Sequence, residues 1–170
     1  APIYKASSLN ICDIAVSKVN KNKQGGNTVY LNFKGNKIVI QGPEMYSPFG
    51  LSEYSTEQGL KYSLDLSFID KEDNERVTEF YTFCKDLDEF MIKYAHIKSV
   101  EWFGKQQPME VIEEFYRPLV KQGKPNKDKP GSLYPDTVKF KLRTRNDVLN
   151  VEMYDTEQNK LSVEDPIKPG

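Results

Sequence analysis

The chain has 170 residues, of which 38% are hydrophobic and 29% are charged, and its formal net charge is −1. These values are typical of a soluble globular protein with one hydrophobic core. No apolar run is long enough to span a membrane, and the N-terminus lacks the apolar region of a signal peptide. We therefore expect an intracellular protein with no membrane contact.

The few cysteine and histidine residues limit the kinds of metal, disulfide and catalytic site that the protein can form. The sequence holds two cysteines, Cys12 and Cys84, and one histidine, His96. This set provides neither a disulfide framework nor a CxxC site, and it argues against a zinc site or a histidine-dependent triad. The sequence also lacks a phosphate-cradling glycine motif and a carboxylate pair suited to acid–base catalysis. We expect no metal, no cofactor and no enzymatic activity.

The first forty residues predict short strands. Residues 10–19 are rich in β-branched side chains and predict a first strand, which a polar loop over residues 20–27 follows. Residues 28–34 alternate between apolar and polar side chains, as half-buried strands do. Gly35 and Asn36 then supply a tight turn before a partner strand at residues 37–41.

Residues 42–54 contain two prolines and two glycines, so regular structure is not expected there. Tyr46 and Phe49 in this loop either pack on a core or remain available for stacking, and packing is the more common outcome. Residues 60–68 alternate as a clear strand, whose polar face carries Ser63, Asp65 and Ser67.

A helical segment follows. Residues 70–74 form an acidic start signal, and the apolar residues from Val77 to Ala95 are spaced as one continuous helical stripe. We expect one long helix to about Phe103, stopped by Gly104. Pro108 opens a second, shorter helix, which Pro118 limits.

The last part of the chain is basic. Residues 121–135 read as a flexible basic arm, and residues 137–145 as a strand that begins the last hairpin. We expect its turn at Asn146 and Asp147, a partner strand at residues 148–154, and a polar tail over residues 156–170.

The strand at residues 137–145 carries cations on one face. Side chains alternate along a strand, so Lys139, Lys141, Arg143 and Arg145 share one face, and Val138, Phe140 and Leu142 share the other. Like charges on one face repel, and no acid interrupts this row. From residue 117 to residue 145 the sequence has nine basic and two acidic residues, a net charge of +7, which leaves −8 for the remainder. A basic segment on an acidic protein is the footprint of a polyanion site.

The order of elements predicts a mainly β fold with a helical insertion at about residues 70–119. Short strands with a helical segment before the last hairpin suit an OB-fold, a five-stranded Greek-key barrel, as one domain over residues 1–155. Periodicity alone also allows a β-sandwich with a helical insertion.

Several segments of the sequence resemble those of a known protein family. They are PEMYSPFGLS (43–52), KYSLDLSF (61–68), LDEF (87–90), EWFGK (101–105), YRPLVK (116–121) and YPDTVKFKL (134–142). In these runs the chain resembles the replicative single-stranded-DNA-binding proteins of nucleo-cytoplasmic large DNA viruses, which are similar to phage-type OB-fold binders. The resemblance covers roughly residues 28–154. Phage-type members end in a long acidic tail, whereas this chain ends VEDPIKPG.

The resemblance implies a sequence-nonspecific single-stranded-DNA-binding protein of viral DNA replication and recombination. Its setting would be the host cytoplasm or nucleus at sites of viral replication. RNA as a ligand, replication proteins as partners and a homodimer stay open.

A single-strand binder needs cations along the backbone and rings that stack bases. The candidate nucleic-acid-binding residues are therefore Lys139, Lys141, Arg143, Arg145, Lys121, Lys124, Lys127, Lys129, Tyr134, Tyr30, Tyr46 and Phe49.

Two other functions remain open from the residues alone. A virion or structural interaction protein would use the basic face to bind an acidic partner or to package nucleic acid. A nuclease would hold a metal with acids such as Asp65, Asp86 and Asp88.

Overall fold

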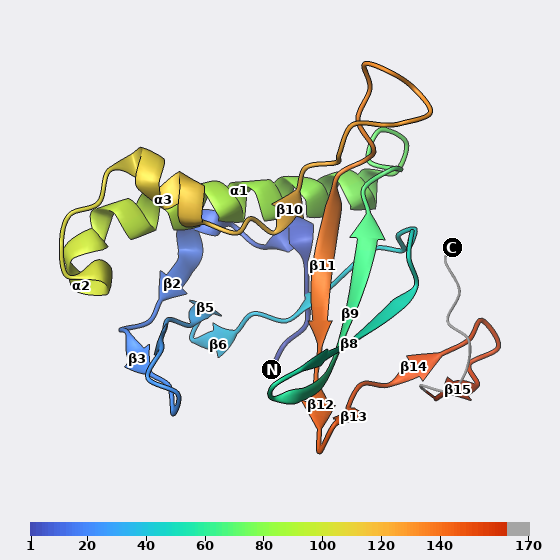
Figure 1. The fold of residues 1–170 in the computed structure, drawn as a ribbon, viewed down its shortest axis with the longest axis horizontal. Helices are drawn as coiled ribbons and strands as arrows, with labels where there is room; N and C mark the ends of the chain where they lie inside the picture. Colours follow the sequence, from blue (N-terminus) through green and yellow to red (C-terminus); the bar gives the residue numbers. More distant parts are fainter. Residues whose placement is uncertain (163–170) are drawn as a thin grey trace. The chain divides into compact units, whose positions relative to one another are not determined.

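The computed structural model describes residues 1–162, in a mixture of sheet and helix (Figure 1). The chain forms two compact units. Unit 1 comprises Ala1–Glu44 and Lys71–Val120, and unit 2 comprises Met45–Asp70 and the described residues from Lys121 onward. The expectation of one domain over residues 1–155 stays a prediction.

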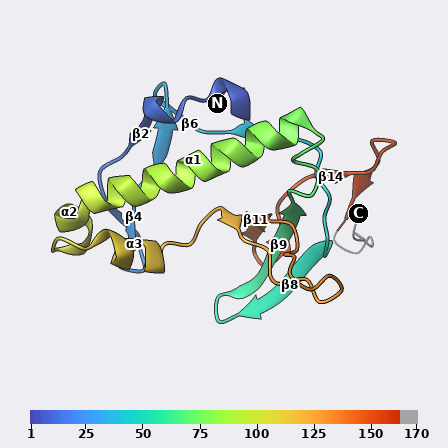
Figure 2. The same ribbon diagram turned by 90° about the horizontal axis from the view of Figure 1, so that it is seen from above.

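The helices of unit 1 confirm the helical stripe. They are α1 (Glu75–Ile97), α2 (Ser99–Phe103) and α3 (Met109–Phe115), and α3 lies beside α1 (Figures 1 and 2). Asn74 caps α1, because its side-chain oxygen accepts hydrogen bonds from the backbone N–H groups of Arg76 and Val77 at 3.1 and 3.4 Å. The single helix expected to about Phe103 is interrupted at Lys98, and Gly104, with φ of 79°, ends α2.

The strands of unit 1 are short. They are β1 (Tyr4–Lys5), β2 (Ile14–Val16), β3 (Asn20–Lys21), β4 (Asn27–Thr28), β5 (Leu31–Phe33), β6 (Asn36–Lys37) and β7 (Ile40–Gln41). They form the three-stranded sheet β2-β5-β6, the pair β3-β4 and the parallel pair β1-β7.

Two local expectations for unit 1 are wrong. The strand expected at residues 10–19 is reduced to β2, because the Asn10 side chain accepts a hydrogen bond from the Cys12 N–H at 3.0 Å. This bond favours the 3-10 turn η2 (Ile11–Asp13), and a second such turn, η1, spans Ala6–Ser8. The hairpin turn lies at Lys34 and Gly35, with φ of 49° and 75°, one residue earlier than expected.

Asp88 ties α1 to the segment that follows α3. It is 7% exposed, and its carboxylate accepts hydrogen bonds from the Tyr116 hydroxyl at 2.8 Å and from the N–H groups of Leu119 and Val120 at 2.8 and 3.2 Å. Because its carboxylate accepts these hydrogen bonds, Asp88 has a structural role, unlike the metal ligand that a nuclease would need.

Asp88 also affects a neighbouring thiol. Burial, with a contribution from Asp88, raises the pKa of the Cys84 thiol to about 12, so this thiol stays protonated at neutral pH.

The main sheet of unit 2 is antiparallel, in the order β11-β9-β8. These strands are β8 (Leu51–Thr56), β9 (Gly59–Ser67) and β11 (Thr137–Leu142), and the short β10 (Val120–Lys121) spans the passage from unit 1 to unit 2. The strands expected at residues 60–68 and 137–145 are confirmed, although the second is interrupted at Arg143, between β11 and the next strand. The irregular loop expected at residues 42–54 ends early, because its last residues belong to β8 and pair with β9.

The chain then continues in two small hairpins of unit 2. They contain β12 (Thr144–Arg145), β13 (Val148–Leu149), β14 (Met153–Tyr154) and β15 (Lys160–Leu161). The turn at Asn146 and Asp147 is confirmed, with φ of 52° and 61°, as a type I′ hairpin requires.

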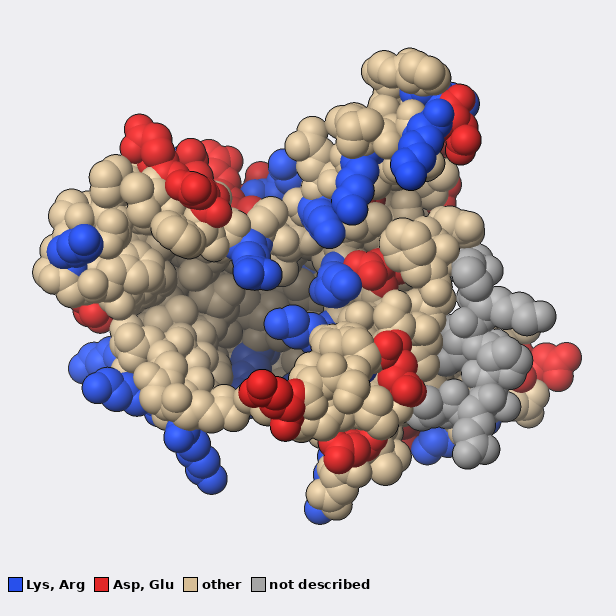
Figure 3. All heavy atoms as spheres, in the orientation of Figure 1, with Lys and Arg blue, Asp and Glu red and all other residues tan. Residues whose placement is uncertain are grey.

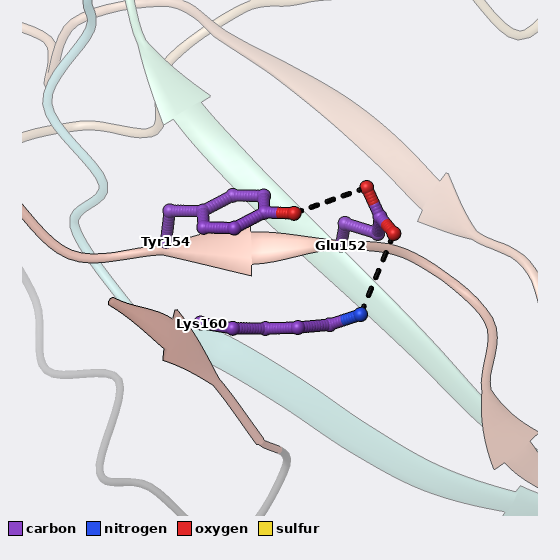
Figure 4. Close-up of polar contacts among 3 residues, drawn as sticks. All are labelled: Glu152, Tyr154 and Lys160. Carbon is purple, nitrogen blue, oxygen red and sulfur yellow. Dashed lines mark hydrogen bonds and ion pairs between the residues drawn. The ribbon is translucent and has the colours of Figure 1, made fainter. Parts of the chain in front are cut away.

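The second of these hairpins falls partly within the expected tail. Its β15 pairs with β14, and residues 163–170 lie outside the described part of the chain. Figure 4 shows Glu152 of this hairpin between the Tyr154 hydroxyl, at 3.2 Å, and the Lys160 ammonium group, at 3.4 Å. Both partners of the ion pair are exposed, so we expect it to add at most about 1 kcal/mol to stability.

The five-stranded barrel is not found, because the described strands form several small sheets and no closed barrel. Barrel closure requires each strand to have neighbours on both sides. Here the three-residue β2 has β5 as its partner, and β8 pairs with β9 at one edge of the sheet while β9 also pairs with β11. The α-helices do lie between Asp70 and Pro118, as expected, whereas the two 3-10 turns lie outside that range.

Replacement of Asp88 by alanine should destabilise the protein. The Tyr116 hydroxyl and two backbone N–H groups would lose their acceptor, and an unsatisfied buried donor costs about 1–3 kcal/mol. We expect a loss of roughly 3 kcal/mol in urea unfolding. Asp86→Ala, on the exposed face of the same helix, should change the unfolding free energy by less than about 0.5 kcal/mol. Equal losses in the two variants would contradict the role of Asp88.

Candidate nucleic-acid interface

Residues 121–135 form a paired hairpin, which we call the basic hairpin. The Tyr134 N–H donates to the Lys124 carbonyl at 2.8 Å, and the Asn126 N–H donates to the Ser132 carbonyl at 2.9 Å. A β-bridge between Pro125 and Leu133 lies between these bonds. The flexible arm expected from composition is therefore wrong, because composition does not report pairing between the two sides of the segment.

The base of the basic hairpin is closely packed. Gly123 donates its N–H to the Asp136 carboxylate at 3.1 Å, and the Asp136 carbonyl accepts from the Phe68 N–H at 2.9 Å, which anchors the hairpin to the end of β9. A Cβ atom at position 123 would overlap the carbonyl of Tyr134. Glycine is thus the residue that lets the two sides approach each other here.

The register of β11 against β9 decides what surrounds the cations. Lys139 lies opposite Asp65, and Lys141 lies opposite Ser63, so all four side chains share one face of the sheet. The Lys139 ammonium group and the Asp65 carboxylate form an ion pair at 3.4 Å, with side-chain exposures of 52% and 12%. The row of cations therefore does face an acid, which comes from a strand much earlier in the sequence.

A cleft of about 460 Å³ lies between the basic hairpin and β11. Residues of the basic hairpin, of β11 and of the loop before β8 line it. Six residues expected from the sequence meet here: Lys121, Lys124, Lys127, Lys139, Tyr134 and Phe49. Figure 3 shows basic side chains over the hairpin and over β11, with acidic side chains beside them. The fold thus combines four ammonium groups with two aromatic rings, one 42% exposed (Tyr134) and the other 66% exposed (Phe49).

The other expected residues do not line this cleft. Lys141, Arg143, Arg145 and Lys129 are exposed on unit 2, and they extend the basic surface beyond it. Tyr46 is 43% exposed on unit 2, where its carbonyl accepts from the Ser67 N–H at 2.8 Å. Tyr30 is 53% exposed and belongs to unit 1.

Sequence reasoning did not assign the other six lining residues to the site, and Asp65 and Gly123 are the two among them that shape the cleft most. Alternation along residues 60–68 had placed Asp65 on the polar face of its strand, but it could not identify the residue opposite. Gly123 had no signal beyond its place in a basic segment.

The hydrophobic face of β11 differs from the expectation in one residue. Val138 is 2% exposed, as an inward-facing residue should be, whereas Phe140 is 39% exposed. A loss of about 3–5 kcal/mol on replacing Phe140 by alanine applies only to a fully buried ring, so a smaller loss is expected. Val138 is the buried residue of this strand.

A second cavity, of about 490 Å³, lies in unit 1 and is apolar. Its lining includes Met91, Trp102, Val111 and Phe115, with Arg117 as its one charged residue. A cavity with a single cation does not match a chain of phosphates. The cleft of unit 2 is therefore the better candidate for a polyanion.

Within residues 1–162, no group of three or more histidine, cysteine, aspartate or glutamate residues is placed to hold a metal. None of the helices in this part of the chain has the length and hydrophobicity that a membrane span requires. Comparison with protein-family models, with curated proteins and with solved structures finds no match for the chain.

Replacement of Gly123 by alanine should destabilise the cleft. The new methyl group would displace the Tyr134 carbonyl, and overpacking of this kind costs typically about 1–3 kcal/mol. Thermal unfolding should show a lower Tm for Gly123→Ala. Gly42→Ala, where an added Cβ meets nothing within 4 Å, should leave the Tm nearly unchanged. An unchanged Tm in Gly123→Ala would contradict the close approach.

Proposed function

We propose that this protein binds single-stranded nucleic acid, principally DNA, in the cleft between the basic hairpin and β11. The observation that carries the proposal is the meeting of four lysines and two exposed rings around one cleft. The lysines would follow the phosphates, and the rings would stack bases with little regard to sequence.

A single strand fits this arrangement better than a duplex does. The bases of a duplex are already stacked and paired, so their faces are not available to Tyr134 and Phe49. The strand would leave the cleft along the exposed face of β11, past Lys141 and Arg143, which were expected from the sequence to follow the backbone.

The biological role forms part of the same proposal. The resemblance to viral single-strand binders supports action in viral DNA replication and recombination, at replication sites in the host cytoplasm or nucleus. It also supports an OB-type relationship, in which a sheet face and its loops enclose a strand. Replication proteins and a second copy of the chain are the partners that this role suggests.

Fluorescence titration with single-stranded and duplex oligonucleotides of equal length, at several salt concentrations, tests the proposal. We expect tighter binding of the single strand and an affinity that falls as salt rises. Equal binding of duplex and single strand would instead indicate a nonspecific polycation. Binding of an acidic protein but of neither oligonucleotide would favour an interaction protein.

Replacement of Lys124 and Lys127 together by serine should weaken binding and reduce its salt dependence. Both residues line the cleft, and each lost phosphate contact lowers the log–log salt slope by roughly 0.7 for single strands. Loss of two contacts should therefore reduce the slope by about 1.4. Titrations of the two proteins at matched salt concentrations measure the difference.

Two double variants with the same charge change complete this experiment. Lys141→Ser with Arg143→Ser tests the exit along β11 and should reduce the slope less. Lys37→Ser with Lys85→Ser, at exposed residues of unit 1, should leave it unchanged. If the β11 pair has the larger effect, the strand face rather than the cleft is the principal backbone contact.

Replacement of Tyr134 by alanine should weaken single-strand binding more than it changes stability. A stacked base contributes about 1–3 kcal/mol in alanine substitutions, and Tyr134 contributes its main chain, which the variant keeps, to the hydrogen bonds of the hairpin. Tyr134→Phe should retain the affinity. Tyr154→Ala removes another exposed ring of unit 2 and should have no effect. Equal affinities of Tyr134→Ala and the unchanged protein would exclude stacking at this position.

A further inference from the structure

The acid in the cleft is unexpected for a surface that binds phosphates. Asp65 lines the cleft together with Lys121, Lys124, Lys127 and Lys139, and its side chain is only 12% exposed. A carboxylate there repels the phosphate backbone of a nucleic acid and neutralises part of the charge of Lys139, so it weakens nonspecific binding of nucleic acid. An ion pair whose lysine is half exposed also contributes little stability. Neither backbone binding nor stability therefore accounts for an acid at this place.

The ion pair presents a pattern of hydrogen-bonding groups to the cleft. The carboxylate of Asp65 has two oxygen atoms that accept hydrogen bonds, and the ammonium group of Lys139, 3.4 Å from one of them, donates. The cleft therefore offers two acceptors next to one donor. A base edge with two adjacent donors next to one acceptor would form hydrogen bonds with all three groups.

Guanine carries that complement. Its Watson–Crick edge offers two adjacent donors, N1–H and the N2 amino group, beside the O6 acceptor. Thymine offers one donor, N3–H, between two acceptors, and the edges of cytosine and adenine each offer one amino group beside a ring-nitrogen acceptor. Guanine can therefore use both oxygens of Asp65 and the ammonium group of Lys139, whereas each of the other bases leaves at least one of these groups without a partner.

We infer that the cleft prefers a guanine base in the single strand that it binds, with Asp65 and Lys139 contacting the Watson–Crick edge. This inference rests on the proposed function and adds a preference at one base position. The rings of Tyr134 and Phe49, which line the same cleft, provide the stacking surface for that base. The edge is available only in an unpaired base, so the same contact favours single strands over duplexes.

Oligothymidylate strands with isolated substitutions test the inference. Every fourth thymine is replaced by guanine, inosine, adenine or cytosine, and a spacing of this kind keeps guanine runs from associating. We expect the guanine strand to bind about fivefold more tightly than the thymine strand, near the lower end for a two-bond base contact. Inosine is a purine that differs from guanosine only in lacking the N2 amino group, so the inosine strand should bind like the thymine strand.

A pair of variants identifies the residue responsible. Asp65→Asn is of equal size but replaces one acceptor oxygen by a donor, so the guanine-to-inosine ratio should fall to about one while binding of all strands strengthens. Asp147→Asn makes the same charge change at an exposed turn residue outside the cleft and should keep the ratio. The ratio measured on the unchanged protein decides the question even if Asp65→Asn does not fold.

The outcomes separate this inference from the proposed function. Tight binding of all single strands with equal affinity for guanine and inosine would overturn the guanine preference and leave single-strand binding intact. No binding of any strand would overturn both. A guanine preference that survives Asp65→Asn would show that other residues read the base, and would also contradict the assignment.

Discussion

The antiparallel register of β11 against β9 is the constraint on which the candidate site depends. Lysines at alternate positions of β11 lie on one face, where they repel one another. The register places Asp65 of β9 opposite Lys139, so one of these cations has a partner while Lys141 faces the neutral Ser63. A shift by one residue would turn the acid to the opposite face of the sheet and leave the row without a counter-charge.

The second requirement is the fixed position of the basic hairpin. Without its internal hydrogen bonds, residues 121–135 would be a charged tether that loses conformational entropy whenever it closes over a ligand. The hydrogen bonds between Tyr134 and Lys124 and between Gly123 and Asp136 order this segment when the protein folds. The conformational entropy is therefore lost before a ligand binds. Three of the four lysines that line the cleft, Lys121, Lys124 and Lys127, are thereby held in place before any ligand arrives.

Unit 1 contributes stability in a different way. Its long helix buries Val77, Phe80, Phe83, Cys84 and Leu87, and Asp88 on the same helix satisfies three donors from the segment after α3. This segment passes directly into unit 2 at Lys121. The polar contacts of Asp88 therefore hold the last residues of unit 1 against its long helix.

The sequence by itself determined which residues share a face and where the chain turns. Alternation identified the cationic row of β11 and the polar face of β9, the three-and-four spacing identified α1, and Asn146-Asp147 identified a hairpin turn, because these signals depend on neighbours within a few residues. It also supplied the lysines and rings that line the cleft. Only the tertiary structure decided that β2 pairs with β5 in a small sheet, that residues 121–135 form a hairpin and that Asp65 lies opposite Lys139. The physical reason is that strand partners are chosen by contacts between distant segments, and periodicity reports the face of a residue but not the residue that lies across from it.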